Sequence, residues 1–370
     1  MNGNYKECKK CVMDTSDKNI IFNKDGICNH CLEAEGILES IKIAEEESNK
    51  MLKEITNKIR KDAKNNEYDS IIGLSGGVDS SYVAYIAKKY GLNPLAVHFD
   101  NGWNSEIAVS NIKNIVDICK FDLETYVINW KEFRDLQRSF LKAGVVDIEM
   151  LTDHAISAAI FKIAKKHNVK YILTGSNKAT EHGMPKSWVH RKQDFKNIKS
   201  IHKKFGEVPL KTYPHTSTLE FYAIKFFGLG LTNVDFLNKL IYKKNDVIKV
   251  LEKELKWKNY GGKHYESIFT KFYQAYILPN KFNMDKRRVH LSALIRNQEI
   301  SREEAIIELQ KLIYKEEELK IDKEYVLKKL GFTNKEFDTI MTDKPCEHLD
   351  YGSDENYVKY LKKIYYLIKG

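Results

Sequence analysis

The sequence lacks any apolar run long enough to cross a membrane as a helix, which takes about 18 consecutive apolar residues. The nearest such run, residues 219–231, is interrupted by Glu220 and Lys225. Residues 1–10 are polar and contain none of the apolar stretch that marks a signal peptide. We therefore expect no membrane partner and a cytoplasmic location.

Two common nucleotide-binding motifs are also missing. No G-x-x-x-x-G-K segment followed by Ser or Thr occurs, and the Gly262-Lys263 pair is followed by His264. The G-x-G-x-x-G pattern is absent as well. These absences exclude a Walker-type phosphate loop and the usual dinucleotide fingerprint. The sequence also has no repeat of fixed period and no low-complexity tract.

The excess of positive charge is modest for the length of the chain. Its 370 residues include 61 Lys and Arg against 51 Asp and Glu, which gives a formal charge of +10. Such a balance suits nucleotides, phosphates, nucleic acid or an acidic partner equally. Because the basic residues are spread along the chain, the charge is weak evidence for RNA, and we do not expect a nucleic-acid partner.

Cysteine is scarce except at the start, where four of the six cysteines occur. Cys8 and Cys11 form one C-x-x-C pair, and Cys28 and Cys31 form another. Two such pairs can complete a tetrahedral metal site, and the spacing fits a structural zinc ribbon. An iron–sulfur cluster and a redox pair are the alternatives. Cys119 and Cys346 stand alone, and we expect neither to be a nucleophile; Cys119 lies in an apolar helical pattern and is predicted to be core.

Alternating strands and helices are predicted between residues 67 and 175. Strands are expected at 68–74, 94–99, 123–129 and 170–173, and helices at 79–90, 107–118, 130–142 and 156–167. Such alternation predicts a parallel sheet with right-handed crossovers. Ligands of these sheets lie beyond the carboxyl ends of the strands. Beyond about residue 215 the pattern is mainly helical, with helices expected at 245–255, 301–314, 322–330, 334–342 and 356–368.

Residues 75–81 read Ser-Gly-Gly-Val-Asp-Ser-Ser, and they follow a predicted strand and open a predicted helix. The glycines allow a sharp turn and close approach to a ligand, and the helix start favours an anion. A carboxylate would repel phosphate, so Asp79 is expected to hold a Mg²⁺ ion that bridges phosphate oxygens. We therefore predict nucleotide contacts from Ser75, Gly76, Gly77, Val78, Asp79, Ser80 and Ser81.

Polar segments follow two other predicted strands. The first contributes His98, Asp100 and Asn101, and the second contributes Thr174, Gly175 and Asn177. Both segments are expected at the carboxyl edge of the sheet, beside residues 75–81. They resemble the nucleotide-contacting turns of PP-loop enzymes, and this resemblance implies that they contact the nucleotide.

Two segments nearer the C-terminus are dense in polar and aromatic groups. Residues 257–270 include Lys263, His264 and Glu266, and residues 281–292 include Lys286 and Arg287. Solvated helix faces are the simpler explanation of such charge runs. The interleaved Tyr, Trp and Gly residues favour a functional role instead.

Together these motifs resemble the N-acetyl sugar amidotransferase family. The resemblance rests on CKKCVMDTSD and GICNHC near the start, SGGVDSS, TGSNKATEHG, GGKHYES and KFNMDKRRVHLS. One departure is Asn283, where the family pattern has Gly. Members are PP-loop enzymes, which cleave ATP between the α and β phosphates and transfer AMP to an oxygen of the substrate. They are similar to enzymes of bacterial surface polysaccharides and nonulosonic acids that convert an acetamido group to an acetamidino group.

The resemblance implies a fold and a division of the chain. The expected class is α/β, with a parallel five-stranded, Rossmann-like sheet of the adenine nucleotide alpha-hydrolase type. The predicted parts are a zinc ribbon (1–36), a linking helix (37–66), a PP-loop ATP-binding domain (67–215) and a mainly helical C-terminal region (216–370).

The same resemblance implies roles for particular residues. Lys286 and Arg287 are expected to contact ATP phosphates or acidic groups of the sugar. The substrate pocket is expected to contain Lys263, His264 and Glu266, with Glu181 and His182 as further members. The implied cofactors are ATP, Mg²⁺ and a structural Zn²⁺.

Amidation also requires a source of ammonia. A glutaminase needs a cysteine nucleophile, and neither Cys119 nor Cys346 has a setting that suggests one. The family resemblance implies a separate glutaminase subunit and a cyclase-like barrel subunit that deliver ammonia. The apolar stretch at 221–231 is either a docking surface for them or a buried helix.

Two other classes compete with this interpretation. A tRNA-modifying PP-loop enzyme of the thiolation type would also suit a basic chain with an N-terminal metal module. Such enzymes usually need catalytic cysteines or an iron–sulfur cluster in the α/β domain, where only Cys119 occurs. The third class is a non-enzymatic zinc-ribbon adaptor, against which the intact 75–81 loop argues.

Overall fold

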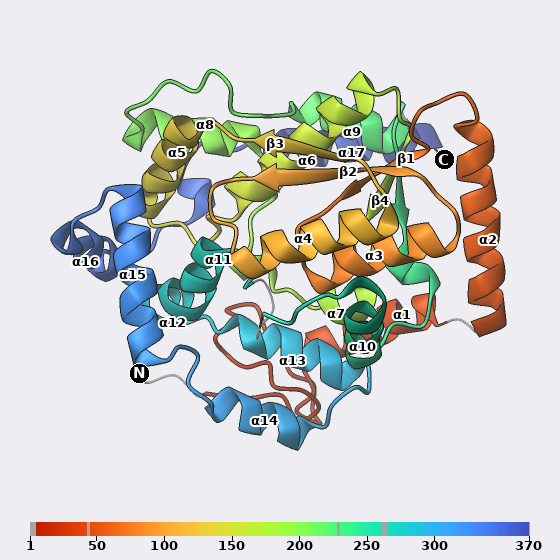
Figure 1. Cartoon of the computed structure of the whole chain (residues 1–370). Helices are drawn as coiled ribbons and strands as arrows, with labels where there is room; N and C mark the ends of the chain where they lie inside the picture. Colours follow the sequence, from red (N-terminus) through yellow and green to blue (C-terminus); the bar gives the residue numbers. More distant parts are fainter. Residues whose placement is uncertain (1–4, 43–44, 228–229, 261–264, 370) are drawn as a thin grey trace.

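The computed structural model describes residues 5–42, 45–227, 230–260 and 265–369. Its centre is a five-stranded sheet in the order β3-β2-β1-β4-β5, in which all neighbouring strands are parallel (Figure 1). The strands are β1 (Ser70–Gly73), β2 (Pro94–Asp100), β3 (Leu123–Val127), β4 (Tyr171–Thr174) and β5 (Thr232–Asp235). The predicted five-stranded parallel sheet is confirmed. Because β5 pairs with β4, the sheet extends past residue 215, the predicted end of the ATP-binding domain.

Helices cover both faces of the sheet, as the alternation of the strand residues requires. Ile71 and Leu95 pack on one face with Ile163 of α6 (Met150–Lys166), whereas Ile72 and Ala96 pack on the other. Because successive strand residues point to opposite faces, both faces of a central strand must be apolar. The second face is covered by α2 (Glu45–Asp62), α3 (Val78–Lys89), α4 (Glu106–Cys119) and α10 (Lys244–Leu255).

The other helices of the first half are α1 (Asn29–Ile41), α5 (Trp130–Ala143), α7 (Lys178–Glu181), α8 (Phe195–Phe205) and α9 (Thr218–Phe227). Each predicted α/β helix is present, although α6 begins six residues before its predicted start. The single linking helix is replaced by α1 and α2, one on each side of residues 43–44. Cys119 is buried, as predicted.

The C-terminal region is helical, as predicted. It contains α11 (Ile268–Phe272), a π-helical segment η3 (Tyr273–Ile277), α12 (Leu278–Phe282), α13 (Lys286–Arg296), α14 (Arg302–Gln310), α15 (Glu316–Leu330), α16 (Asn334–Thr342) and α17 (Glu355–Lys369). Helix α15 begins earlier than expected, since three glutamates occupy its first turn, where the positive end of the helix dipole favours them.

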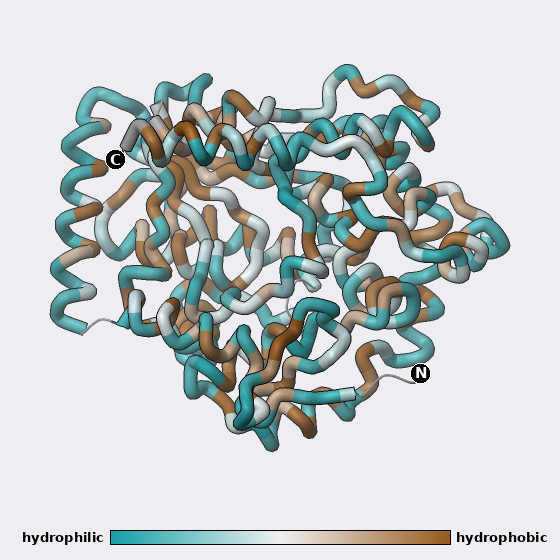
Figure 2. Tube along the Cα trace, turned by 180° about the vertical axis from the view of Figure 1, so that it is seen from behind, coloured by the Kyte–Doolittle hydropathy of each residue, from teal (hydrophilic) through white to brown (hydrophobic). Residues whose placement is uncertain are grey.

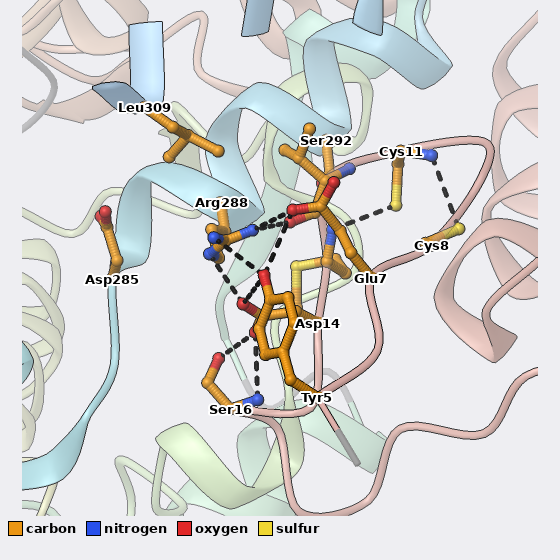
Figure 3. A network of polar contacts seen from close by, with 12 residues as sticks. Tyr5, Glu7, Cys8, Cys11, Asp14, Ser16, Asp285, Arg288, Ser292 and Leu309 are labelled. Atoms are coloured by element: carbon orange, nitrogen blue, oxygen red, sulfur yellow. Dashed lines mark hydrogen bonds and ion pairs between the residues drawn. The ribbon is translucent and has the colours of Figure 1, made fainter. Parts of the chain in front are cut away.

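The N-terminal ribbon packs directly on this helical region. Arg288 of α13 donates to the Val12 carbonyl (2.7 Å) and to Glu7 (2.9 Å), and its Nε lies 3.0 Å from Asp14 (Figure 3). The Val12 amide donates in turn to Ser292 Oγ (3.2 Å). One continuous core contains the ribbon cysteines together with side chains of α5, α6, α11, α13 and α15. The ribbon is therefore part of the main body of the protein.

Hydrophobic segments gather at the strands and inside the molecule, and hydrophilic segments form most of the outer helices (Figure 2). None of the helices in the described ranges has the length and apolar character needed to span a membrane.

Gly76 is required by the backbone of the 75–81 loop. Its φ is +80°, and a Cβ there would lie 2.6 Å from the Ala108 carbonyl oxygen. The Gly76 carbonyl accepts from Trp257 Nε1 (2.8 Å), so the loop is fixed by α4 and by a residue about 180 positions later. Only glycine combines this φ with so close a backbone neighbour.

We predict that Gly76→Ala lowers the free energy of unfolding by about 2–4 kcal/mol, from the positive φ and the contact with Ala108. Urea denaturation would measure this loss. Gly36→Ala is the matched control: Gly36 is helical and nothing lies within 4 Å of its added Cβ, so the change should be neutral or slightly stabilising. Equal stability of the two variants would contradict the role of Gly76.

Candidate active site at the carboxyl edge of the sheet

Two adjoining pockets lie at the carboxyl ends of the strands. The first, here called the loop pocket, has a volume of about 330 Å³ and is lined by residues 75 and 77–80 together with α7, α10 and α13. The second, the strand-end pocket, measures about 600 Å³ and is lined by the ends of β1, β2 and β4 and by α6. Both pockets include Ser75, Gly175 and Glu266. They therefore form one site with two compartments, which meet at these three residues.

The start of α3 forms one wall of the loop pocket. Its N-cap residue is Gly77, which has no side chain to cap the first turn, whereas Ser105 and Asn129 cap α4 and α5. Ser75 Oγ accepts from the Gly77 amide and lies 3.2 Å from Ser80 Oγ. The positive end of the α3 dipole and two hydroxyl groups thus face the pocket, which suits an anion.

Carboxylates in the loop pocket are suited to hold a cation beside that anion. Asp79 Oδ1 accepts from Tyr242 Oη (2.7 Å) and from Asn177 Nδ2 (3.0 Å), and the Asn177 amide donates to Glu181 Oε2 (3.4 Å). Asp79 and Glu181 both line the pocket and share Asn177 as a partner. Oxygen ligands of this kind are those that Mg²⁺ takes in phosphate sites, so these residues fit the ion.

Aromatic residues close the loop pocket. Trp257 and Tyr260 line it beside Tyr242, and a methyl group on Gly77 would lie 3.3 Å from Tyr260 Oη. Burial raises the pKa of Tyr242 above its ordinary value, and the negative charge of Asp79 adds to this effect. The Tyr242 hydroxyl therefore stays protonated and able to donate.

The strand-end pocket has an apolar part, here called the floor, and a charged part around Lys286 and Glu149, here called the rim. Val97, Phe99, Ile156 and Ile172 are among the floor residues. On the rim, Lys286 Nζ lies 2.7 Å from Glu149, which also accepts from Gln274. Such a pocket can bury a flat apolar group at its floor and bind polar groups at its rim.

The structure brings most predicted site residues to these pockets. The residues in the walls are Ser75, Gly77, Val78, Asp79, Ser80, His98, Asn101, Thr174, Gly175, Glu181, Glu266 and Lys286. Asn177 is fully buried and donates a hydrogen bond to Asp79, which lines the loop pocket, and Gly76 shapes the loop. His98 lines the strand-end pocket, but its Nδ1 bonds to the Leu74 carbonyl and its Nε2 accepts from Asn104.

Four predicted site residues are placed elsewhere. Ser81 is buried and donates to the Gly77 carbonyl (2.6 Å). Asp100 turns away to accept from the Gly102 amide and from Asn104. Arg287 is held by Asp285 and by the carbonyls at the end of α14, and His182 bonds to the Lys178 carbonyl (2.8 Å). None of these four side chains is part of the lining of either pocket, and their direct ligand contacts stay predictions. Lys263 and His264 lie outside the described residues.

Sequence reasoning missed several residues of the walls. Tyr242, Lys244, Glu149 and Lys192 line the pockets, and no motif marks them. Trp257 and Tyr260 belong to a segment noted for its aromatic content, without a stated role. These residues come from loops and helix ends that meet only in the folded chain.

The four ribbon cysteines form a separate buried cluster. Cys8 Sγ lies 3.9 Å from Cys31 Sγ, Cys11 Sγ lies 3.7 Å from Cys28 Sγ, and all four sulfurs lie within 4.8 Å of one another. Hydrogen bonds from Cys28 and Cys31 lower the pKa of Cys11. The cluster could hold a zinc ion or an iron–sulfur cluster.

Arg296 of α13 completes the surroundings of the sulfur cluster. It donates to Cys31 Sγ and Cys11 Sγ at 3.4 Å each. His30, beside Cys31, bonds instead to Asp17 (2.8 Å) and is not part of the cluster. The cluster therefore consists of four cysteine sulfurs with the positively charged Arg296 guanidinium beside them.

Parts of the chain match two known families. Residues 49–213 match the family model of NAD synthase, and residues 266–365 match "LPS biosynthesis protein WbpG-like, C-terminal domain". None of the curated protein sequences is significantly similar to the chain.

Among solved structures, the NH3-dependent NAD synthetase from Campylobacter jejuni is 16% identical, with a TM-score of 0.29 over 56% of this chain and 83% of that chain. The NMN synthetase from Francisella tularensis is 15% identical, with a TM-score of 0.29 over 60% and 98%. The U34-tRNA thiolase NcsA from Methanococcus maripaludis, with its 4Fe–4S cluster, is 15% identical, with a TM-score of 0.35 over 84% and 91%. Similarity at this level carries no information about the substrate.

The two family matches cover part of the site, whereas the loop-pocket residues between 242 and 260 lie in neither match. The NAD synthase match contains residues 75–81 and β1 to β4, and PP-loop enzymes of this type use ATP and Mg²⁺ to form C–N bonds. The WbpG-like match contains Glu266 and Lys286, which line the same site. The two matches together support the N-acetyl sugar amidotransferase family within the PP-loop ATP pyrophosphatase superfamily.

Proposed function

We propose that the chain is an ATP-dependent amidotransferase that converts an acetamido group of a bacterial sugar to an acetamidino group. The acetamido oxygen attacks the α-phosphorus of ATP, and pyrophosphate leaves. Ammonia then adds to the activated carbon, the C–O bond breaks, and AMP departs with the oxygen. The products are the amidine, AMP and pyrophosphate. An amide oxygen is a poor leaving group, which is why the reaction needs activation by ATP.

The observation that carries this proposal is the shared wall of the two pockets. Residues from the NAD synthase-like segment and from the WbpG-like segment meet there. One site thus combines the anion-binding loop with Glu266 and Lys286, which lie in the segment that matches a lipopolysaccharide biosynthesis family. We place the polyphosphate in the loop pocket and the adenosine on the apolar floor of the strand-end pocket. The sugar then takes the rim near Lys286 and Glu149.

Magnesium would supply charge neutralisation for the leaving pyrophosphate, held by Asp79 with Glu181 beside it. Ser75 and Ser80 orient the phosphate oxygens. Glu266 lies where the compartments meet and is best placed to accept a proton from the attacking ammonia. Ammonia itself is proposed to come from a separate glutaminase subunit through a barrel-shaped partner.

For the sulfur cluster we propose a single structural zinc ion. A Zn–S bond of about 2.3 Å gives an S···S edge of about 3.8 Å in a regular tetrahedron. The Cys11–Cys28 and Cys8–Cys31 pairs, at 3.7 and 3.9 Å, agree with one central ion. An iron–sulfur cluster would hold its cysteines farther apart around several irons. With four protein ligands the zinc would have no open position for water, so it would support the fold.

The substrate can be tested directly. Purified protein with ATP, Mg²⁺, ammonium chloride and a panel of N-acetylated sugars, including nonulosonic acids, should release AMP and pyrophosphate with one of them. The sugar product should be lighter by about one mass unit, because NH replaces O. Pyrophosphate release with tRNA and with no sugar would support the thiolation alternative.

That alternative lacks support in the α/β domain, where burial raises the pKa of Cys119 to about 11 and leaves its thiol unreactive.

Asp79→Asn should reduce pyrophosphate release by on the order of 100-fold or more, because the amide is a poor Mg²⁺ ligand. Asp100→Asn is the matched control, since Asp100 turns away from both pockets, and it should retain activity within about tenfold of wild type. Wild-type pyrophosphate release by the Asp79 variant would refute the role given to this residue.

Cys28→Ser should lower the metal content from about one zinc ion per chain to nearly none and should lower the melting temperature. Metal analysis and thermal unfolding would measure both effects. Cys346→Ser, which removes a cysteine remote from the cluster, should leave both unchanged. Full zinc content in the Cys28 variant would rule out the tetrahedral site, and iron in place of zinc would favour a cluster.

A further inference from the structure

Within the described parts of the chain, the side-chain hydrogen bonds of the Asp79 carboxylate both go to one oxygen. Its Oδ1 accepts two hydrogen bonds, from Tyr242 Oη at 2.7 Å and from Asn177 Nδ2 at 3.0 Å. Both donors come from segments far along the chain, after β5 and after β4. A carboxylate oxygen with two good donors has its lone pairs largely occupied, so the other oxygen is the one left for a further ligand.

Tyr242 is itself firmly placed. It is only 5% exposed, its ring meets Tyr82 edge to face at 6.1 Å, and its carbonyl accepts from Asn297 Nδ2. Its position follows from β5 and the short helical turn of Phe236–Lys239, which lead into it. A side chain packed in this way holds its hydroxyl at a fixed point and so fixes the rotamer of Asp79.

Asn177 is also fixed in place, and it is hydrogen-bonded both to α7 and to the two carboxylates of the loop pocket. It is fully buried, and its Oδ1 accepts from the Ala179 amide as the N-cap of α7. Its backbone amide donates to Glu181, and its Nδ2 donates to Asp79. The residue therefore sets the spacing between the two carboxylates that line the loop pocket.

We propose that Tyr242 and Asn177 are positioning residues for the divalent cation of the ATP complex. They occupy Oδ1 of Asp79 and present Oδ2 to the ion, with Glu181 held beside it. The inference rests on the proposed magnesium role of Asp79, and it does not depend on which sugar is the substrate. A residue behind a metal ligand typically changes metal affinity by about 10- to 100-fold when its donor is removed.

A purely structural role for Tyr242 would give a different result. Loss of a buried hydroxyl would lower stability in the same way with or without a cation present. Positioning of Asp79 would instead shift the cation affinity of the folded protein. Cation affinity therefore distinguishes the two roles.

The experiment is a Mn²⁺ titration of the full chain, monitored by electron paramagnetic resonance, with an ATP analogue that has a methylene bridge between the α and β phosphates. Tyr242→Phe keeps the ring and removes the hydroxyl, and the dissociation constant for Mn²⁺ should rise by about 10- to 100-fold. Tyr85→Phe is the matched control, because Tyr85 also stacks on Tyr82, at 5.8 Å, and does not line the loop pocket. Its Mn²⁺ affinity should equal that of wild type.

Asn177→Ser provides a second variant in case Tyr242→Phe folds poorly. Serine can still cap α7 but cannot reach Asp79 with an amide donor, so Mn²⁺ affinity should again fall. Unchanged affinity in both folded variants, or an equal loss in Tyr85→Phe, would overturn the proposal. Failure to find a sugar substrate would leave this titration unaffected, so the two failures can be told apart.

Discussion

The contact between the thiol cluster and Arg296 is the constraint on which the arrangement of the site depends. Arg296, in the last turn of α13, donates to two of the four buried sulfurs, and its positive charge would offset the negative charge of thiolates there. Arg302 adds hydrogen bonds to the carbonyls of Cys8 and Cys11. Helix α13 is thereby fixed to the ribbon at one end. Its opposite end carries Lys286, and its middle carries His290 into the wall of the loop pocket.

The ribbon also supports the other side of the site. His30 and Ser187 both bond to Asp17, which joins the ribbon to the segment that follows α7. Helix α7 ends in Glu181, and its N-cap is Asn177, the residue that connects both carboxylates of the loop pocket. The N-terminal cysteine ribbon thus contacts two walls of a pocket formed by residues much later in the chain. Ordering these loops costs conformational entropy, and the burial of side chains in the shared core offsets this cost.

The loop that begins α3 is held by contacts from three directions. Ala108 of α4 excludes any side chain at position 76, Trp257 bonds to the Gly76 carbonyl, and Tyr242 bonds to Asp79. The loop is held by long-range contacts where an anion would bind, whereas the rim of the strand-end pocket carries charged side chains. This division is compatible with the proposed placement of the ATP phosphates in the loop pocket and of the sugar at the rim.

The sequence alone determined the features that depend on local spacing. The C-x-x-C pairs, the apolar strands with alternating helices, and the Ser-Gly-Gly-Val-Asp-Ser-Ser loop each carry their signal within a few residues, and the structure has the sheet, the helices and the cysteine cluster they predict. Tertiary structure alone decided which side chains face the ligand. Ser81 and Asp100 belong to predicted segments but point away, because backbone groups one turn or two residues distant satisfy them. Tyr242 and Glu149 reach the pockets from segments without a motif, since their positions follow from β5 and from the start of α6, and long-range packing leaves no local pattern.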